Sequence, residues 1–136
     1  MTTLHGQPHV DRYLETDGED GYHWRNDTTI LLLTTKGAKS GRSYTHALIY
    51  REHGDGYLVV ASKGGAEQPP SWYVNLSADP DVQVQIKGER FAAHARTAAP
   101  AEKPPMWAAM TEVWPDYDEY QKKTSRAIPI VVLERA

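Results

Sequence analysis

Short β-rich runs of strand length recur along this chain, separated by residues that favour turns. Residues 82–86 alternate strictly between apolar and polar side chains, as in a strand with one exposed face. Residues 53–56, His-Gly-Asp-Gly, join two such runs and give a strong hairpin signal. The pattern predicts six strands, at residues 28–35, 44–51, 57–62, 82–86, 91–97 and 128–134.

Short helices are predicted between these runs. Val10, Tyr13 and Leu14 are expected to share the apolar face of the first helix. Pro115 interrupts the third helix or begins a fourth, because proline is tolerated in a first turn but not in a helix interior. The predicted helices are residues 9–16, 71–76, 104–114 and a segment after Pro115.

The resulting order is one helix, three strands, a helix, two strands, two helices and a last strand. Most of the strands are joined by hairpins, so the sheet should be mainly antiparallel, and six strands of mixed pattern suggest a closed or half-closed barrel. We expect one domain, residues 1–136, in which residues 1–27 form a helical or irregular segment that packs on the barrel.

Composition narrows the classes of function. The net charge of −3 argues against nucleic-acid binding, which needs a basic surface. The absence of cysteine excludes disulfides, thiolate metal sites and cysteine nucleophiles. The first residues lack the pattern of a signal peptide, and the longest apolar runs are too short to cross a bilayer. We therefore expect a cytoplasmic protein without a membrane anchor.

The first candidate site is the turn at residues 36–41, which follows a predicted strand. Lys39, Ser40 and Arg42, together with the turn amides, can hold a phosphate or carboxylate. The Gly-x-Lys-Ser fragment is not a P-loop, because the first glycine is missing and a strand rather than a helix follows. A solvated hairpin tip with solubilising charges is the alternative interpretation.

The second candidate is the sequence Ser62-Lys63-Gly64-Gly65, between a predicted strand and a predicted helix. Glycine lacks a Cβ, so a flat ring or a phosphate can approach the main chain closely. The lysine adds a positive charge beside the backbone N–H groups. A turn with only a conformational need for glycine is the alternative.

The third candidate is an aromatic stripe of Trp114, Tyr117 and Tyr120, among acidic residues that keep the segment from being wholly buried. Tyrosine hydroxyls can donate to a carbonyl or nitro oxygen on which negative charge develops. The six histidines show no metal-ligand spacing, and we predict no metal site. Neither a GxSxG nor a GxGxxG motif occurs.

In their order along the chain, several stretches resemble the deazaflavin (F420)-dependent nitroreductase family of actinobacteria. The matching stretches are residues 31–41, 59–66, 72–76, 81–85, 114–121 and 128–132. The resemblance implies a mainly β (α+β) fold, a split β-barrel of about six mostly antiparallel strands flanked by short helices. It also implies an F420-dependent reductase of the nitroreductase or quinone reductase type. The expected substrates are small molecules: quinones, enones or nitroaromatics.

The resemblance also implies roles for individual residues. The coenzyme is expected to bind to Lys36, Lys39, Ser40, Gly41, Arg42, Ala61, Ser62, Lys63, Gly64, Gly65 and Trp72. Tyr117, Tyr120 and Ser62 are the expected catalytic residues. Two positions depart from the family pattern: Tyr44 replaces an arginine of many relatives, and Trp114 replaces a tyrosine of some.

Two other functions are compatible with these residues. A related split barrel can hold FMN, with its phosphate at the turn that contains Lys39. Alternatively, the aromatic wall of Trp107, Trp114 and Tyr117 suits a non-catalytic protein that binds a fatty acid, a tetrapyrrole or the coenzyme itself. The sequence is compatible with a monomer or a homodimer, and with peripheral association with a membrane if the substrate is a lipid-soluble quinone.

Overall fold

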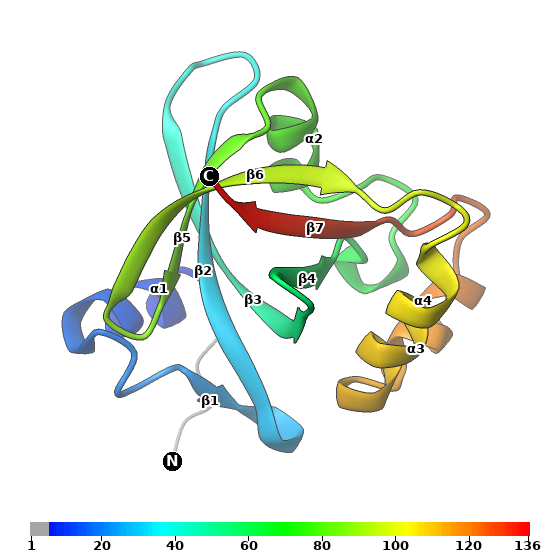
Figure 1. Cartoon of the computed structure of the whole chain (residues 1–136), viewed down its shortest axis with the longest axis horizontal. Helices are drawn as coiled ribbons and strands as arrows, with labels where there is room; N and C mark the ends of the chain where they lie inside the picture. The colour runs from blue at the N-terminus through cyan, green and yellow to red at the C-terminus, as the bar shows by residue number, and fades with distance from the viewer. Residues whose placement is uncertain (1–5) are drawn as a thin grey trace.

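Six antiparallel strands enclose the core as a barrel in the computed structural model, which describes residues 6–136 (Figure 1). The six barrel strands are β2 (Thr28–Lys36), β3 (Ser43–His53), β4 (Gly56–Val60), β5 (Asp81–Ile86), β6 (Glu89–Thr97) and β7 (Ile130–Arg135), and a seventh strand, β1 (His23–Trp24), pairs with β2 alone. The helices are α1 (Gly6–Thr16), α2 (Ser71–Ala78), α3 (Lys103–Val113) and α4 (Asp116–Lys122), with short 3₁₀ turns η1 (Arg25–Asp27) and η2 (Lys63–Gly65).

The long strand β2 closes the barrel. One edge of β2 pairs with β3, and Leu32–Thr34 pair with β5, which gives the cyclic order β2-β3-β4-β7-β6-β5. Every pairing is antiparallel, which confirms the predicted barrel. The short strand β1 was not predicted, because two residues carry no detectable periodicity.

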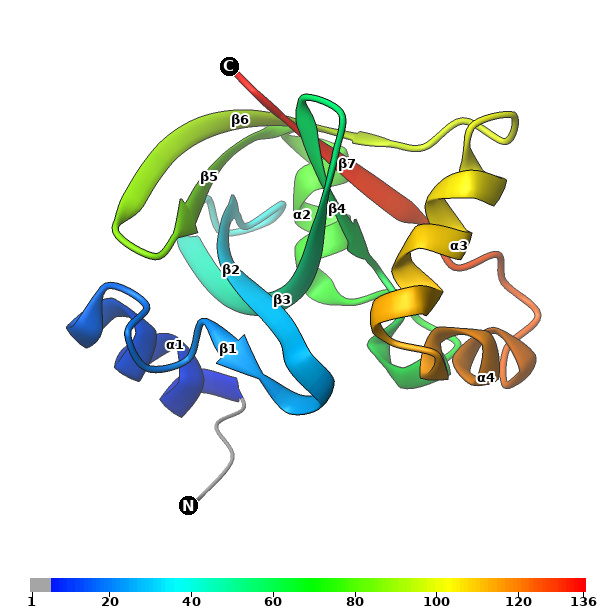
Figure 2. The ribbon, with the colours of Figure 1, turned by 60° about the horizontal axis from the view of Figure 1, so that its bottom comes forward.

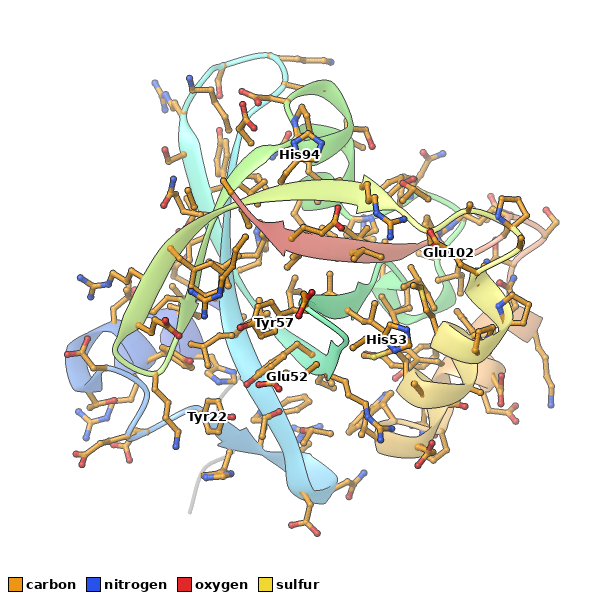
Figure 3. All side chains as sticks on the ribbon, viewed as in Figure 1. Tyr22, Glu52, His53, Tyr57, His94 and Glu102 are labelled. Carbon is orange, nitrogen blue, oxygen red and sulfur yellow. The ribbon has the colours of Figure 1, made fainter. Side chains whose placement is uncertain are left out.

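Alternate residues of β2 belong to two different cores. Leu31 and Leu33 face the barrel interior, where Trp72 and Leu76 of α2 close one end. Aromatic rings close the opposite end, including Tyr22 and Tyr57, which are labelled in Figure 3. The barrel is therefore filled by side chains along its length.

Helices cover two outer regions of the barrel, as Figure 2 shows. Helices α3 and α4 pack over β4 and β7, where Met106 and Met110 contact Leu58 and its neighbours. Helix α1 packs over β2 through Val10 and Tyr13. Residues 1–5 of the predicted 1–27 segment lie outside the described residues.

Some details differ from the sequence predictions. Helix α1 begins at Gly6, and α2 extends to Ala78. Leu14 is 43% exposed rather than buried with Val10 and Tyr13, because the buried face of α1 also contains His9 and Leu14 lies at its edge, about 100° from Tyr13. Among residues 6–136, no helix is both long and apolar enough to span a membrane.

The hydroxyl of Tyr13 joins three elements, since it donates to the carbonyl of Ile30 at 3.1 Å and accepts from the N–H of Lys87 at 2.6 Å. We expect Tyr13→Phe to lower the free energy of unfolding by about 1–2 kcal/mol, because the buried carbonyl of Ile30 and the part-buried N–H of Lys87 both lose this partner. Urea unfolding measures the change. In the control variant Tyr73→Phe, which loses an exposed hydroxyl pair with Thr97, the loss should stay below about 0.5 kcal/mol. Equal losses in both variants would contradict the bridging role.

Candidate active site

The turn at the end of β4 has an unusual backbone. Lys63, Gly64 and Gly65 have successive φ angles of 46°, 64° and 85°, in the left-handed region that non-glycine residues seldom adopt. A Cβ added to Gly64 would meet no atom within 4 Å, so this backbone surface is open. Ser62 beside it is buried. The turn can therefore accept a flat group directly against its main chain.

Arg126 holds this turn from the side of the protein. Its guanidinium donates to the carbonyl of Ala66 at 2.8 Å, of Ser62 at 2.9 Å and of Ala61 at 3.3 Å. Gln121 of α4 in turn donates to the carbonyl of Arg126 at 2.7 Å. A single side chain thus satisfies three carbonyls around the strained residues.

Helix α4 packs directly on the same turn. A Cβ at Gly65 would lie 2.5 Å from the carbonyl oxygen of Tyr120, so only glycine allows this contact. The close approach brings two tyrosines of α4 beside the turn. Gly64 and Gly65 therefore serve different purposes: the first leaves space, and the second allows packing.

A pocket of about 300 Å³ lies between this turn and the aromatic residues, and we call it the aromatic pocket. It is lined by Gly6, His9, Trp24, Ile30, Ala47, Leu48, Ile49, Val60, Ser62, Lys63, Gly64, Pro70, Trp72, Trp114, Tyr117 and Tyr120. The lining comes from early, middle and late segments of the chain, and it includes three tryptophans and two tyrosines.

The aromatic side chains of this wall contact one another. Tyr117 and Tyr120 meet edge to face with ring centroids 6.1 Å apart, and the indole N–H of Trp114 donates to the hydroxyl of Tyr120 at 3.3 Å. Trp24 stacks on Trp114 at 5.7 Å. Burial raises the pKa of Tyr117 above its ordinary value, so its hydroxyl stays protonated at neutral pH.

A second cleft, of about 470 Å³, lies at the turn between β2 and β3, and we call it the cationic cleft. It is lined by Gly37, Ala38, Lys39, Ser40, Tyr44, Ser71, Val74 and Asn75. Pro70 and Trp72 line the aromatic pocket while Ser71 lines this cleft, so the two sites meet at the start of α2.

Asn75 anchors the cationic cleft to the barrel. Its side chain accepts from the N–H of Ala38 at 3.1 Å and donates to the hydroxyl of Thr35 at 3.2 Å. The hydroxyl of Tyr44 hydrogen-bonds to the hydroxyl of Ser40 at 3.2 Å, so this tyrosine helps to shape the turn.

The predicted site residues fall into three groups. Ser62, Lys63, Gly64, Trp72, Tyr117 and Tyr120 line the aromatic pocket, and Lys39 and Ser40 line the cationic cleft. Ala61 and Gly65 are buried behind the turn. Lys36, Gly41 and Arg42 are exposed near the cationic cleft, outside both linings.

Several contributors to the site were not predicted from the sequence, and four of them have clear roles in its geometry. They are His9, Trp24, Asn75 and Arg126. Arg126 lies in a polar stretch without periodicity, and its partners are about sixty positions away. The prolines before α2 marked a helix start but gave no sign that Asn75 supports a distant turn.

These residues fit a deazaflavin coenzyme. A tricyclic ring needs an open, nearly flat protein surface, which the backbone of Gly64 offers. An anionic tail needs cations and donors outside the ring site, which Lys39 and Ser40 offer across the start of α2.

Comparisons with known proteins agree with this geometry. A sequence model of the family described as F420H(2)-dependent quinone reductase matches residues 6–135. An F420H(2)-dependent quinone reductase of Mycobacterium tuberculosis is 40% identical over 128 residues, which cover 90% of this chain and 85% of the relative.

Two solved structures are also similar. One, described as an F420-H2 dependent reductase, has a TM-score of 0.71 and 42% identity, and the match covers 77% of this chain and 93% of that chain. Another, described as a domain-swapped dimer, has a TM-score of 0.74 and 40% identity. The match covers 92% of this chain and 93% of that chain.

The comparisons confirm the predicted resemblance, the oxidoreductase class and the coenzyme F420, and they do not favour the FMN-binding or non-catalytic alternatives. The chain belongs to the F420H(2)-dependent quinone reductase family.

Proposed function

We propose that the chain reduces a quinone in the aromatic pocket, with the ring of F420 against Ser62–Gly64 and the anionic tail of the coenzyme in the cationic cleft. The observation that carries this proposal is the junction of the two cavities at the start of α2. One cavity has an open backbone surface faced by aromatic rings, and the other has a lysine and a hydroxyl.

The reduced coenzyme supplies a hydride when it is bound. The protein groups orient the acceptor and stabilise the charge that develops on it. Tyr117 donates a hydrogen bond to a carbonyl oxygen of the quinone, and its raised pKa keeps that donor protonated. The rings of Trp114 and Tyr120 hold the flat acceptor and exclude water.

A quinone suits this pocket better than a smaller or more polar acceptor. It is flat, it is apolar apart from its oxygens, and it places a carbonyl where a phenol can donate. Enones and activated nitroaromatics share part of this chemistry and belong in the same substrate panel. The oligomeric state stays a prediction between monomer and homodimer, and the relative described as a domain-swapped dimer favours the second.

Coenzyme binding tests the placement of the tail. We expect oxidised F420 to quench the protein fluorescence saturably and Lys39→Ala to weaken binding about 10-fold, because a charge-assisted contact is lost. Lys87→Ala is the matched control, since it removes the same charge at the turn between β5 and β6. Equal weakening in both variants would reject the cationic cleft as the tail site. Tighter binding of FMN than of F420 would instead favour a flavin reductase.

Turnover tests the role of Tyr117. We expect Tyr117→Phe to lower the kcat of quinone reduction about 10-fold or more, while the Kd for F420 changes less than twofold. Because burial raises the pKa of Tyr117, wild-type activity should show no loss from its ionisation up to about pH 10. Tyr120→Phe serves for comparison. An unchanged kcat in Tyr117→Phe would remove this hydroxyl from the reaction.

Arg126 is expected to matter for binding as well as for stability. We expect Arg126→Gln to lower the free energy of unfolding by about 2 kcal/mol and to weaken F420 binding about 10-fold, because the turn loses its brace. The control is Arg51→Gln, whose guanidinium donates to the carbonyl of Ala109 on α3. Chemical unfolding and F420 titration measure both effects. Normal F420 affinity in Arg126→Gln would show that the turn keeps its shape without the guanidinium.

A further inference from the structure

A groove of about 740 Å³ lies at the start of α3, away from the proposed coenzyme site, and we call it the α3 groove. It is lined by Tyr73, Thr97, Ala98, Pro100, Lys103, Pro104, Trp107, Gln121, Ala127 and Pro129. Among the described residues, none of these lines the aromatic pocket or the cationic cleft. The groove therefore needs an explanation of its own.

The walls of the α3 groove are mostly apolar and poor in free hydrogen-bonding groups. Three of the lining residues are prolines, which have no N–H to donate. The hydroxyls of Tyr73 and Thr97 bond to each other at 2.9 Å. The side chain of Gln121 accepts a hydrogen bond from the N–H of Ile128 and donates one to the carbonyl of Arg126. A ligand in this groove therefore meets mostly carbon surface, which includes the rings of Trp107 and Tyr73.

Lys103 is the single charged side chain in this lining. It forms no ion pair with any of the described residues, and its Nζ lies 5.4 Å from the centre of the Trp107 ring. Partial burial lowers its pKa, which indicates an ammonium that has lost water without gaining a counter-ion.

The neighbouring carboxylate does not neutralise Lys103. Glu102, labelled in Figure 3, lies just before α3 and is bound by the guanidinium of Arg96 and by the N–H of Ala99. The positive end of the α3 dipole is at the same place, because α3 begins at Lys103. Lys103 and the first turn of α3 therefore place positive charge at the mouth of the groove although the whole chain is net acidic, while the carboxylate of Asp118 is bound by the indole N–H of Trp107.

We propose that the α3 groove is a second ligand site, for a small aromatic monoanion whose rings lie against Trp107 and whose carboxylate or sulfonate pairs with Lys103. Its volume is within the range of sites for small organic ligands. A single unpaired cation at the edge of an apolar surface selects for one negative charge on an apolar body.

The α3 groove is separated from the aromatic pocket by one pair of rings. Trp107 contacts Tyr117 with centroids 6.3 Å apart, and its indole N–H donates to Asp118 at 2.7 Å. A ligand on Trp107 is thus two side chains away from the proposed quinone. Because the two linings are separate, binding in the groove is testable without the coenzyme.

The test uses two fluorescent probes of similar shape on the full chain. The anion is 8-anilinonaphthalene-1-sulfonate, and the neutral counterpart is N-phenyl-1-naphthylamine. We expect saturable binding of both, and Lys103→Gln should weaken the sulfonate about fivefold while leaving the neutral probe within twofold. Lys122→Gln is the matched control, because it removes an exposed lysine of α4 outside the groove and should change neither affinity.

The position of the probes is tested with two variants in which an alanine is replaced by phenylalanine. Ala127→Phe should fill the α3 groove and weaken both probes, whereas Ala47→Phe, in the aromatic pocket, should leave them bound. Far-UV circular dichroism checks that each variant is folded. The proposal is overturned if neither probe binds saturably, if both lysine variants behave alike, or if Ala47→Phe alone abolishes binding.

Discussion

The contact of Arg126 with the main-chain carbonyls of Ala61, Ser62 and Ala66 fixes the geometry on which the site depends. Lys63 takes a left-handed backbone angle that costs free energy for a residue other than glycine, and such a conformation persists only where its surroundings determine it. The guanidinium supplies several donors in one rigid plane, and the carbonyls of Ala61, Ser62 and Ala66 use them. The open surface of Gly64 is a result of that arrangement.

The barrel places this turn beside the other elements that form the candidate site. Strand β4 delivers the turn, α2 closes the barrel end beside it, and α4 rests on Gly65. Asn75 ties α2 to the cationic cleft, so the two cavities keep a fixed relation to each other. The elements that carry aromatic side chains are held by contacts among themselves, as in the stacking of Trp24 on Trp114. A relatively small protein thus holds an open backbone surface and a cleft with a lysine in fixed positions on the two sides of the start of α2.

The local pattern of apolar, polar and turn residues predicted most of the strands and helices. The features that it did not predict depend on contacts between residues far apart in the sequence. The alternation at residues 82–86 and the hairpin at residues 53–56 are local signals, and both lead directly to antiparallel strands. Ser62 and Gly64 were found because glycine beside a strand end is visible in the sequence. Trp24 and Arg126 act only through residues far along the chain, so no local window reveals them. The two-residue strand β1 has too few positions to show a period.

The lining of the aromatic pocket has a consequence for the order in which the protein folds. His9 and Trp24 come from the first elements of the chain, and Trp114, Tyr117 and Tyr120 come from some of the last. Contacts of such long sequence separation form late, after the loops between them have been closed. A chain emerging from the ribosome therefore contains the residues of η2 well before it contains the wall that faces them, and before it contains Arg126, which braces that turn. The aromatic pocket is complete only once early and late elements of the chain have packed together, so its shape depends on the whole fold and not on one local segment.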